Sequence, residues 1–211
     1  MIRLAFSVKL DYGVIEPGAD FIFNFQAAHT RQQRVVNERL EINQNLALQS
    51  HTDPASQSRY LRLSARPGPL EIRYDAVVEL KHHVARPASL AEIPVAQLPP
   101  QVLTFLYPSR YCESDHLAAL AMAEFGSLPQ GYERVQAICN WVQQRVRFQS
   151  NTSNATTTAR DTLAERVGVC RDFTHLAVTL CRCMNIPARY ATGYLGDIGV
   201  PVLPMPGDFS A

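Results

Sequence analysis

Cys170 stands where a nucleophilic cysteine is expected. It follows Gly168 and Val169, at the point where a threonine-rich loop gives way to a predicted helix. The first N–H groups of a helix have no intrahelical acceptor and carry about half a positive charge, and both favour a thiolate over a thiol. A thiolate is the nucleophile that acyl transfer requires. Residues 168–173 therefore indicate a cysteine-dependent enzyme, although they do not by themselves separate a catalytic Cys170 from a structural one.

The four other cysteines show weaker signs of reactivity. Cys139 and Cys181 have the spacing of core residues in predicted helices, where a free cysteine packs as a small apolar side chain. Cys112, near another helix start, is a weaker alternative nucleophile. Cys181 and Cys183 subtend about 200° on a helix, so their sulfurs point apart. No Cys-x-x-Cys or His-x-x-x-His pair occurs in the sequence, and we therefore expect neither a metal nor a cofactor.

A thiol nucleophile usually needs an imidazole base. His175 lies five residues after Cys170, which is about 140° further round the same predicted helix and poorly aimed for direct proton transfer. We interpret it as a helix-surface or interdomain histidine that forms a hydrogen bond. The remaining histidines lie near turns, at a strand end or at a helix start, and none is an obvious base: His29, His51, His82, His83 and His116.

The composition is that of a globular protein without a marked charge bias. The chain has 211 residues, with 46% apolar and 18% charged residues and a net charge of +1. Without a basic block, binding to nucleic acid or to an anionic membrane has little electrostatic support. No apolar run approaches the ~20 residues of a membrane span, and the N-terminus alternates like a strand rather than a signal peptide. Five unevenly spaced cysteines do not suggest a disulfide framework, so we expect a reducing cytoplasm.

The first part of the chain, residues 1–85, alternates in the manner of short antiparallel strands. Turn signals containing proline and glycine separate these strands, as at Pro17-Gly18 and Pro67-Gly68-Pro69. Such a pattern is typical of a β-sandwich, which we expect to act as a scaffold or to gate the substrate. The predicted strands are residues 1–8, 21–25, 33–42, 60–64, 70–75 and 77–80.

The rest of the chain changes character twice. Prolines recur through residues 86–112, which we expect to form an extended connector with a short helix starting near Pro99. Apolar spacing then predicts a mainly helical core over residues 113–211. The predicted elements are helices at residues 115–125, 131–146 and 170–185, an extended start at 147–148, a loop at 151–158 and a strand at 188–195.

Around Cys170 the sequence resembles the transglutaminase-like superfamily, in particular bacterial members described as cysteine proteases. The match runs through residues 154–164, 168–176 and 193–195: a threonine loop, a Gly-x-Cys-Arg-Asp-Phe helix start, an Ile-Pro-Ala-Arg-Tyr segment and then Gly-Tyr. Residues 106–111 are similar to the segment that joins the family's N-terminal β domain to its catalytic core. The resemblance covers most of the chain.

The resemblance implies an α+β fold, in which an N-terminal antiparallel β-sandwich precedes a papain-like core of helices and antiparallel sheet. It also implies a Cys-His-Asp triad with Cys170 as nucleophile, whose own N–H contributes to an oxyanion hole. The family's histidine stands in a later Asp-Phe-His-Ala-Trp motif, and Ser210 occupies that histidine position here. The aspartate would lie beyond Ala211. We therefore expect either a core truncated at its C-terminus or a branch whose histidine has moved or been lost.

Three functions follow from these observations. The favoured one is a cysteine hydrolase, a protease or amidase that attacks a peptide or a glutamine carboxamide and forms a thioester. The alternative is a catalytically degenerate module that binds peptide without cleaving it, and a purely structural domain is the third. Because serine cannot act as the base, we expect this polypeptide by itself to have little or no amidase or transamidase activity. The expected partner is a peptide or protein substrate, and the sequence leaves the acyl acceptor and the oligomeric state open.

Overall fold

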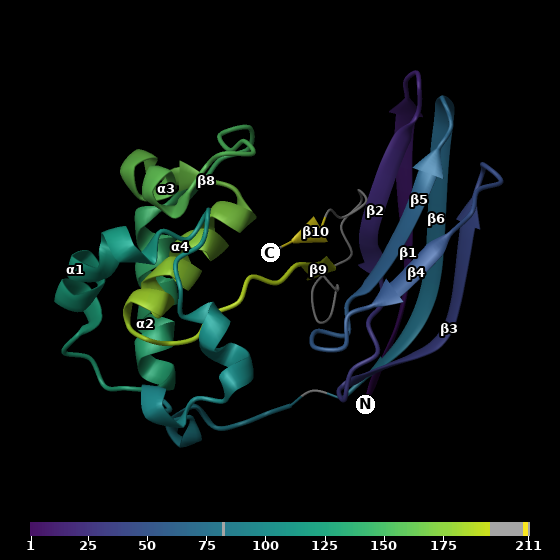
Figure 1. The fold of residues 1–211 in the computed structure, drawn as a ribbon. Coiled ribbons are helices and arrows are strands. Elements are labelled where there is room, and N and C mark those ends of the chain that lie inside the picture. Colours follow the sequence, from purple (N-terminus) through teal and green to yellow (C-terminus); the bar gives the residue numbers. More distant parts are fainter. Residues whose placement is uncertain (82, 195–208, 211) are drawn as a thin grey trace. The chain divides into compact units, whose positions relative to one another are not determined.

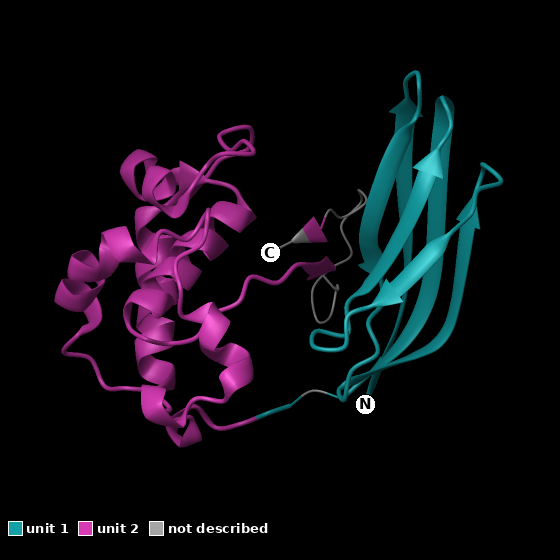
Figure 2. Ribbon diagram, viewed as in Figure 1, with its two compact units in different colours: residues 1–84 teal, residues 85–211 magenta. Residues whose placement is uncertain are grey.

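The computed structural model describes residues 1–81, 83–194 and 209–210. The chain divides into two compact units, Met1–Val84 and Ala85–Ala211 (Figure 2). Strands make up the first unit, and helices dominate the second (Figure 1). In the described ranges, no helix has both the length and the apolar character needed to cross a membrane.

The first unit consists of two three-stranded antiparallel sheets. One has the order β1-β6-β3, and in it β6 pairs with β1 along the full length of both strands. The other has the order β2-β5-β4. The six strands are β1 (Ile2–Val14), β2 (Ala19–Gln26), β3 (Gln33–Ile42), β4 (Gln49–Thr52), β5 (Arg59–Ala65) and β6 (Gly68–Leu80). The antiparallel β-sandwich expected from the sequence is confirmed.

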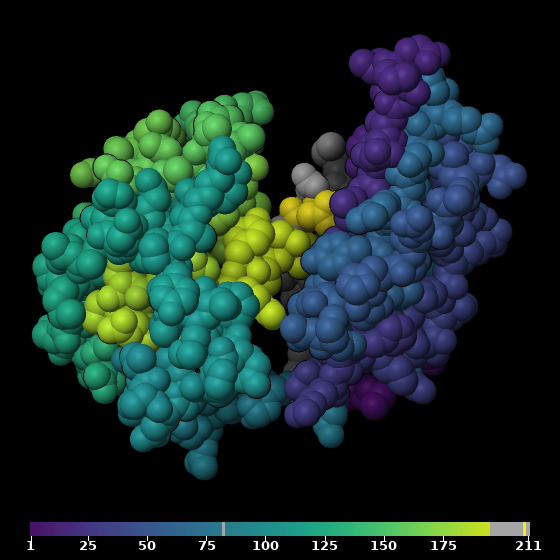
Figure 3. Space-filling model, in the orientation of Figure 1, coloured from purple at the N-terminus to yellow at the C-terminus, as the bar shows by residue number. Residues whose placement is uncertain are grey.

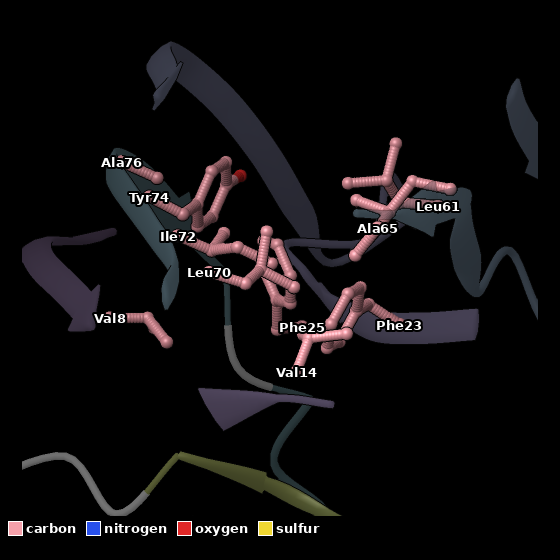
Figure 4. Packing of buried hydrophobic residues seen from close by; sticks show 11 residues of the cluster. Val8, Val14, Phe23, Phe25, Leu61, Ala65, Leu70, Ile72, Tyr74 and Ala76 are labelled. Carbon is pink, nitrogen blue, oxygen red and sulfur yellow. The ribbon is translucent and has the colours of Figure 1, made fainter. Parts of the chain in front are cut away.

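The core of the sandwich lies between the two sheets. Successive side chains of a strand point to opposite faces, and alternate residues of β6, from Leu70 to Ala76, are accordingly buried. Side chains of the second sheet, such as Phe25 and Leu61, belong to the same cluster (Figure 4). Tyr74 is fully buried there, with its ring centroid 5.6 Å from that of Phe25.

The hydroxyl of Tyr74 is the polar tip of this otherwise apolar cluster. It accepts a hydrogen bond from the N–H of Ala27 at 3.2 Å and donates one to Glu38 Oε2 at 2.7 Å. Arg59 in turn binds the Glu38 carboxylate through two hydrogen bonds, of 2.7 and 2.9 Å. Burial, followed by the bond to Glu38, raises the pKa of Tyr74 to about 12. The phenol therefore stays neutral and satisfied inside the sandwich.

The strands differ from their predicted bounds in three ways. β1 continues to Val14, well past residue 8, and residues 70–75 and 77–80 form one strand, β6. β4 was not predicted, because all four of its residues are exposed and it carries no apolar alternation. His83 is exposed beyond the end of β6, and His82 lies outside the described residues.

The second unit is built around helix α4 (Cys170–Cys183). It contacts α1 (Ser114–Phe125), α2 (Tyr132–Arg145) and α3 (Ala159–Glu165). Leu176 and Leu180 of α4 are fully buried in the apolar cluster that these helices share. Two short strand pairs accompany the helices. β7 (Arg147–Phe148) runs parallel to β8 (Val167–Gly168), and β9 (Gly193–Tyr194) runs antiparallel to β10 (Phe209–Ser210). The chain thus has the α+β fold that was expected.

The proline-rich segment 86–112 differs from an extended connector. It contains three 3-10 helices, η1 (Pro87–Ser89), η2 (Val95–Gln97) and η3 (Pro100–Phe105), and belongs to the second unit. Prolines open η1 and η3, because their fixed φ suits the first position of a helix and their missing N–H is not needed there. Glu92 ties the segment to α2 through an ion pair with buried Arg134, at 3.2 Å.

The predicted helices lie within two residues of α1, α2 and α4, but α3 was not predicted. Thr158 caps α3, and its side chain and that of Asp161 each accept a hydrogen bond from the other residue's backbone N–H. The strand predicted at 188–195 is also shorter in the structure. Only Gly193 and Tyr194 pair as a strand within its described part.

Candidate active site

Cys170 is the first residue of α4 and is half-buried. Its carbonyl accepts a hydrogen bond from Thr174 Oγ1 at 3.0 Å, and the residue before it, Val169, has an extended backbone. As the first helical residue, Cys170 has an N–H without an acceptor in its own helix. A thiol and an N–H donor therefore stand together at the positive end of a 14-residue helix.

The turn that presents Cys170 is held by a buried carboxylate. Asp172 has no exposed surface; its Oδ2 accepts a hydrogen bond from Val169 N at 2.8 Å and its Oδ1 accepts one from Ser153 Oγ at 2.8 Å. Gly168 is required beside it, since a Cβ at that position would lie 2.8 Å from the Cβ of Asp172. A negative charge in the first turn also matches the helix dipole. Asp172 thus anchors the turn from which Cys170 projects.

Arg171 connects this helix start to the threonine-rich loop. Its Nη2 donates to Ser153 Oγ at 2.8 Å and to the carbonyl of Asn154 at 2.9 Å, and its Nε lies 3.7 Å from Asp172 Oδ1. The loop is braced on its other side by Tyr111, whose hydroxyl donates to the carbonyl of Ala155 at 2.8 Å. Segments that are distant in the sequence therefore fix the surroundings of Cys170.

His175 is not the hydrogen-bonded surface histidine that we expected. It is 8% exposed, and its Nδ1 has no hydrogen-bond partner. Its ring stacks on Tyr111 with centroids 5.1 Å apart and planes 4° from parallel, and lies 5.0 Å from the ring of Tyr190. Burial lowers the pKa of His175, while the Asp172 carboxylate opposes that shift. The cause of the error is tertiary, because both tyrosines come from segments outside α4.

No hydrogen bond joins the side chain of a described histidine to Cys170. The Nδ1 of His175 has no hydrogen-bond partner in the described part of the chain, and His116 lies exposed in the first turn of α1. Ser210, which we expected at the family's histidine position, pairs as a strand residue with Gly193. Within the described ranges, no three His, Cys, Asp or Glu side chains gather as metal ligands.

The other four cysteines differ from one another in how far their side chains are buried. Cys112 and Cys181 are buried, at 3% and 6% exposure, whereas Cys139 is exposed although its spacing predicted a core position. Its neighbour Ile138 occupies the buried face of α2 instead. Burial raises the pKa of Cys181 to about 12 and that of Cys183 to about 11, so both thiols stay protonated near neutrality. Cys170 therefore combines partial exposure with a helix N-terminus.

Sequence reasoning named Cys170 but missed the residues that position it. Asp172 carried a readable signal, an acidic residue three positions after the residue that caps a predicted helix. Tyr111 and Tyr190 belong to segments that resemble the family, but nothing in the sequence showed that they contact His175, since each reaches it only through the fold.

Comparison with known proteins gives a consistent result. Residues 119–202 match the transglutaminase-like superfamily, and residues 2–101 match the N-terminal domain of bacterial transglutaminases. A crystal structure described as a "Putative Cysteine Protease from Cytophaga hutchinsonii" is 36% identical, with a TM-score of 0.86; the match covers 98% of this chain and 73% of that one. An uncharacterized protein of Mycobacterium leprae is 29% identical over 90 residues, which make up 43% of this chain and 32% of that relative.

Proposed function

Because the chain belongs to the transglutaminase-like superfamily, we propose that it is a cysteine hydrolase in which Cys170 attacks a peptide or glutamine carboxamide. The sulfur of Cys170 forms a bond to the carbonyl carbon, and the C–N bond breaks as the amine or ammonia leaves with a proton. Water then attacks the thioester, which releases the acid and returns the thiol. In this proposal the backbone N–H of Cys170 stabilises the oxyanion of each step.

One observation carries the proposal: a half-buried thiol opens α4 and is positioned by a fully buried carboxylate. A structural cysteine needs neither exposure nor a rigid helix start. Gly168 and the hydrogen bonds to Asp172 instead stabilise the turn that presents the thiol of Cys170.

Alkylation with iodoacetamide at pH 6 tests this directly. A thiol of ordinary pKa near 8.5 is well under 1% ionised at that pH and reacts slowly. Cys139 is the reference within the chain, because it is exposed and lies in the middle of α2, away from any helix start. Since burial raises the pKa of Cys139, the free thiol of N-acetylcysteine is the second reference. Peptide mass spectrometry should show Cys170 labelled at least tenfold faster than both. A rate for Cys170 no higher than that of N-acetylcysteine overturns the proposal.

Turnover distinguishes the hydrolase from a peptide-binding module. Ser210 at the family's histidine position, with no hydrogen bond between a described histidine side chain and Cys170, is what favours the second function. Ammonia release from a glutamine peptide that disappears in Cys170→Ala supports the hydrolase and contradicts the low activity expected of this polypeptide. Retention of the peptide by a protein whose Cys170 labels no faster than N-acetylcysteine supports the binding module.

A further inference from the structure

The second unit contains a cavity of about 340 Å³ beside α4, which we call the Tyr111–Tyr190 cavity. Residues around 105–112 and around 182–190 lie side by side there, in teal and yellow in Figure 3. Arg182 joins these two segments, with hydrogen bonds to the carbonyls of Tyr107 and Ala188 at 2.9 Å each. The lining residues that matter below are Tyr111, Asn154, Arg171, His175, Arg182 and Tyr190.

The cavity lining carries two guanidinium groups, those of Arg171 and Arg182, and no Asp or Glu is among the described lining residues. Arg171 already lies 3.7 Å from the buried Asp172 carboxylate behind the lining, so the unmatched charge is that of Arg182. Arg182 donates only to neutral acceptors, the two carbonyls already named and Ser109 Oγ at 3.0 Å. In the described ranges, its charge therefore has no carboxylate partner. An anion would supply that partner through charge-assisted hydrogen bonds.

His175 provides the second, independent sign of a ligand. It lines the cavity, is more than nine-tenths buried, and holds an Nδ1 without a hydrogen-bond partner. Buried polar groups in native proteins are nearly always paired, and leaving one unpaired is costly. A neutral imidazole carries one N–H donor and one acceptor, so its donor suits an oxygen of a bound anion. The ring of Tyr111 stacks on the imidazole, and the ring of Tyr190 lies 5.0 Å from it.

The cavity lies beside the first turn of α4, where Arg171, which lines it, directly follows Cys170 in the chain. Burial, and after it the charge of Cys170, raises the pKa of Tyr190, which also lines the cavity. One residue of extended peptide spans about 3.3–3.6 Å, and we infer a separation of one or two residues between the anionic group and the carbonyl that Cys170 attacks.

We propose that the Tyr111–Tyr190 cavity binds the free C-terminal carboxylate of a peptide substrate of Cys170. This rests on the proposed function and deepens it. The substrate class is a peptide whose scissile carboxamide lies next to its C-terminus. The guanidinium of Arg171 and that of Arg182 pair with the carboxylate, and the tyrosine rings exclude water around it.

Binding, measured by calorimetry in Cys170→Ala, tests the cavity without any turnover. The probes are N-acetyl-Gln-Gly, which ends in a carboxylate, and N-acetyl-Gln-Gly-amide, which does not. We expect the acid to bind at least tenfold more tightly than the amide, with a difference that shrinks as salt increases. Equal affinities for acid and amide overturn the proposal, and this comparison requires no substitution in the cavity.

Substitutions then assign the carboxylate to its donors. Arg171→Gln, in the same background, should reduce the preference for the acid at least fivefold. Arg160→Gln is the matched control, since Arg160 is exposed on α3 and outside the cavity. Arg182→Lys keeps the positive charge but loses the guanidinium group that donates to the carbonyls of Tyr107 and Ala188, and it should also weaken binding of the acid. An unchanged preference in Arg171→Gln and Arg182→Lys, with the fold intact by circular dichroism, counts against the site.

Displacement of the bound acid by small anions identifies the class of anion that the cavity binds. The binding and alkylation experiments together distinguish the cavity proposal from the hydrolase proposal. Acetate should displace the acid more effectively than inorganic phosphate does; the reverse order would make the cavity a phosphate site and overturn the carboxylate. If Cys170 is rapidly alkylated but acid and amide bind alike, the cavity proposal fails and the hydrolase stands. If the acid is preferred while Cys170 is inert, the hydrolase fails and the cavity stands.

Discussion

Asp172 Oδ2 accepts a hydrogen bond from the backbone N–H of Val169 at 2.8 Å, across the turn that presents Cys170. The carboxylate comes from the helix, and the N–H belongs to the residue before it, so the bond closes the first turn on itself. Because Asp172 is also bonded to Ser153 and has no exposed surface, the turn is tied to the threonine-rich loop. The position of the thiol therefore depends on a residue two positions further along the chain.

Asp172→Asn should destabilise the protein and loosen the site. The amide keeps the shape but loses the charge that two donors and the helix dipole favour, so we expect a loss of about 2 kcal/mol in the free energy of unfolding. Urea denaturation measures it, and the alkylation rate of Cys170 should fall in the same variant. Asp161→Asn is the control: it caps α3 in the same way but is exposed, and should cost about 1 kcal/mol or less.

Gly168→Ala should be costly for a steric reason. The added methyl group would lie 2.8 Å from the Cβ of Asp172, in a fully packed place. We expect a loss of about 1–3 kcal/mol in the free energy of unfolding, since overpacking forces neighbouring atoms to shift. Gly13→Ala provides the comparison, as nothing lies within 4 Å of its added Cβ. Equal effects of the two substitutions in urea denaturation would contradict the close approach of Asp172.

Tyr74→Phe should destabilise the β-sandwich and remove the phenol that ionises at about pH 12. The change leaves the Ala27 N–H without its acceptor, at a cost of about 1–3 kcal/mol. In the folded protein Tyr74 should ionise at about pH 12, later than an ordinary tyrosine near 10. A raised folded pKa contributes stability that is complete below pH 10 and lost as the pH rises toward 12. Ultraviolet titration of the phenols in both proteins checks it; coincident curves above pH 11 would be the contrary result.

His175 should make the protein less stable in mild acid. Because burial lowers its pKa in the folded state, the unfolded chain binds the proton more readily, and stability is lost as the pH falls below about 6.5. The slope of the free energy of unfolding between pH 7.5 and 5 should be smaller in His175→Phe, which keeps the ring between Tyr111 and Tyr190. A slope that is equal in wild type and His175→Phe excludes the buried neutral imidazole.

Elements with a clear local period were predictable from the sequence. The alternation in β2, β3, β5 and β6 and the apolar spacing in α1, α2 and α4 led to helices and strands close to those observed. β4 was not predicted, because its residues are all exposed and show no alternation of apolar and polar side chains. α3 escaped because seven residues carry little periodicity, although the Thr158–Asp161 capping pair was present in the sequence.

Burial of single residues was harder to predict than the elements themselves. Cys139 follows buried Ile138 in α2, and one position of rotation by 100° is enough to move it from core to surface. For His175 the error was the opposite one: it was expected at the surface but is buried, because Tyr111 and Tyr190, from other segments of the chain, cover it. Helical spacing states which residues share a face, whereas a neighbouring segment decides whether that face is covered.

By itself the sequence determined the family, the α+β class and the cysteine that opens a helix, because a motif and a hydrophobic period are local properties of the chain. Only the tertiary structure decided what surrounds Cys170. Asp172 is bonded to Ser153, and His175 is enclosed by tyrosines 64 positions before it and 15 after it. Burial and charge balance depend on such contacts between distant segments, and no spacing in the sequence encodes which segments will meet.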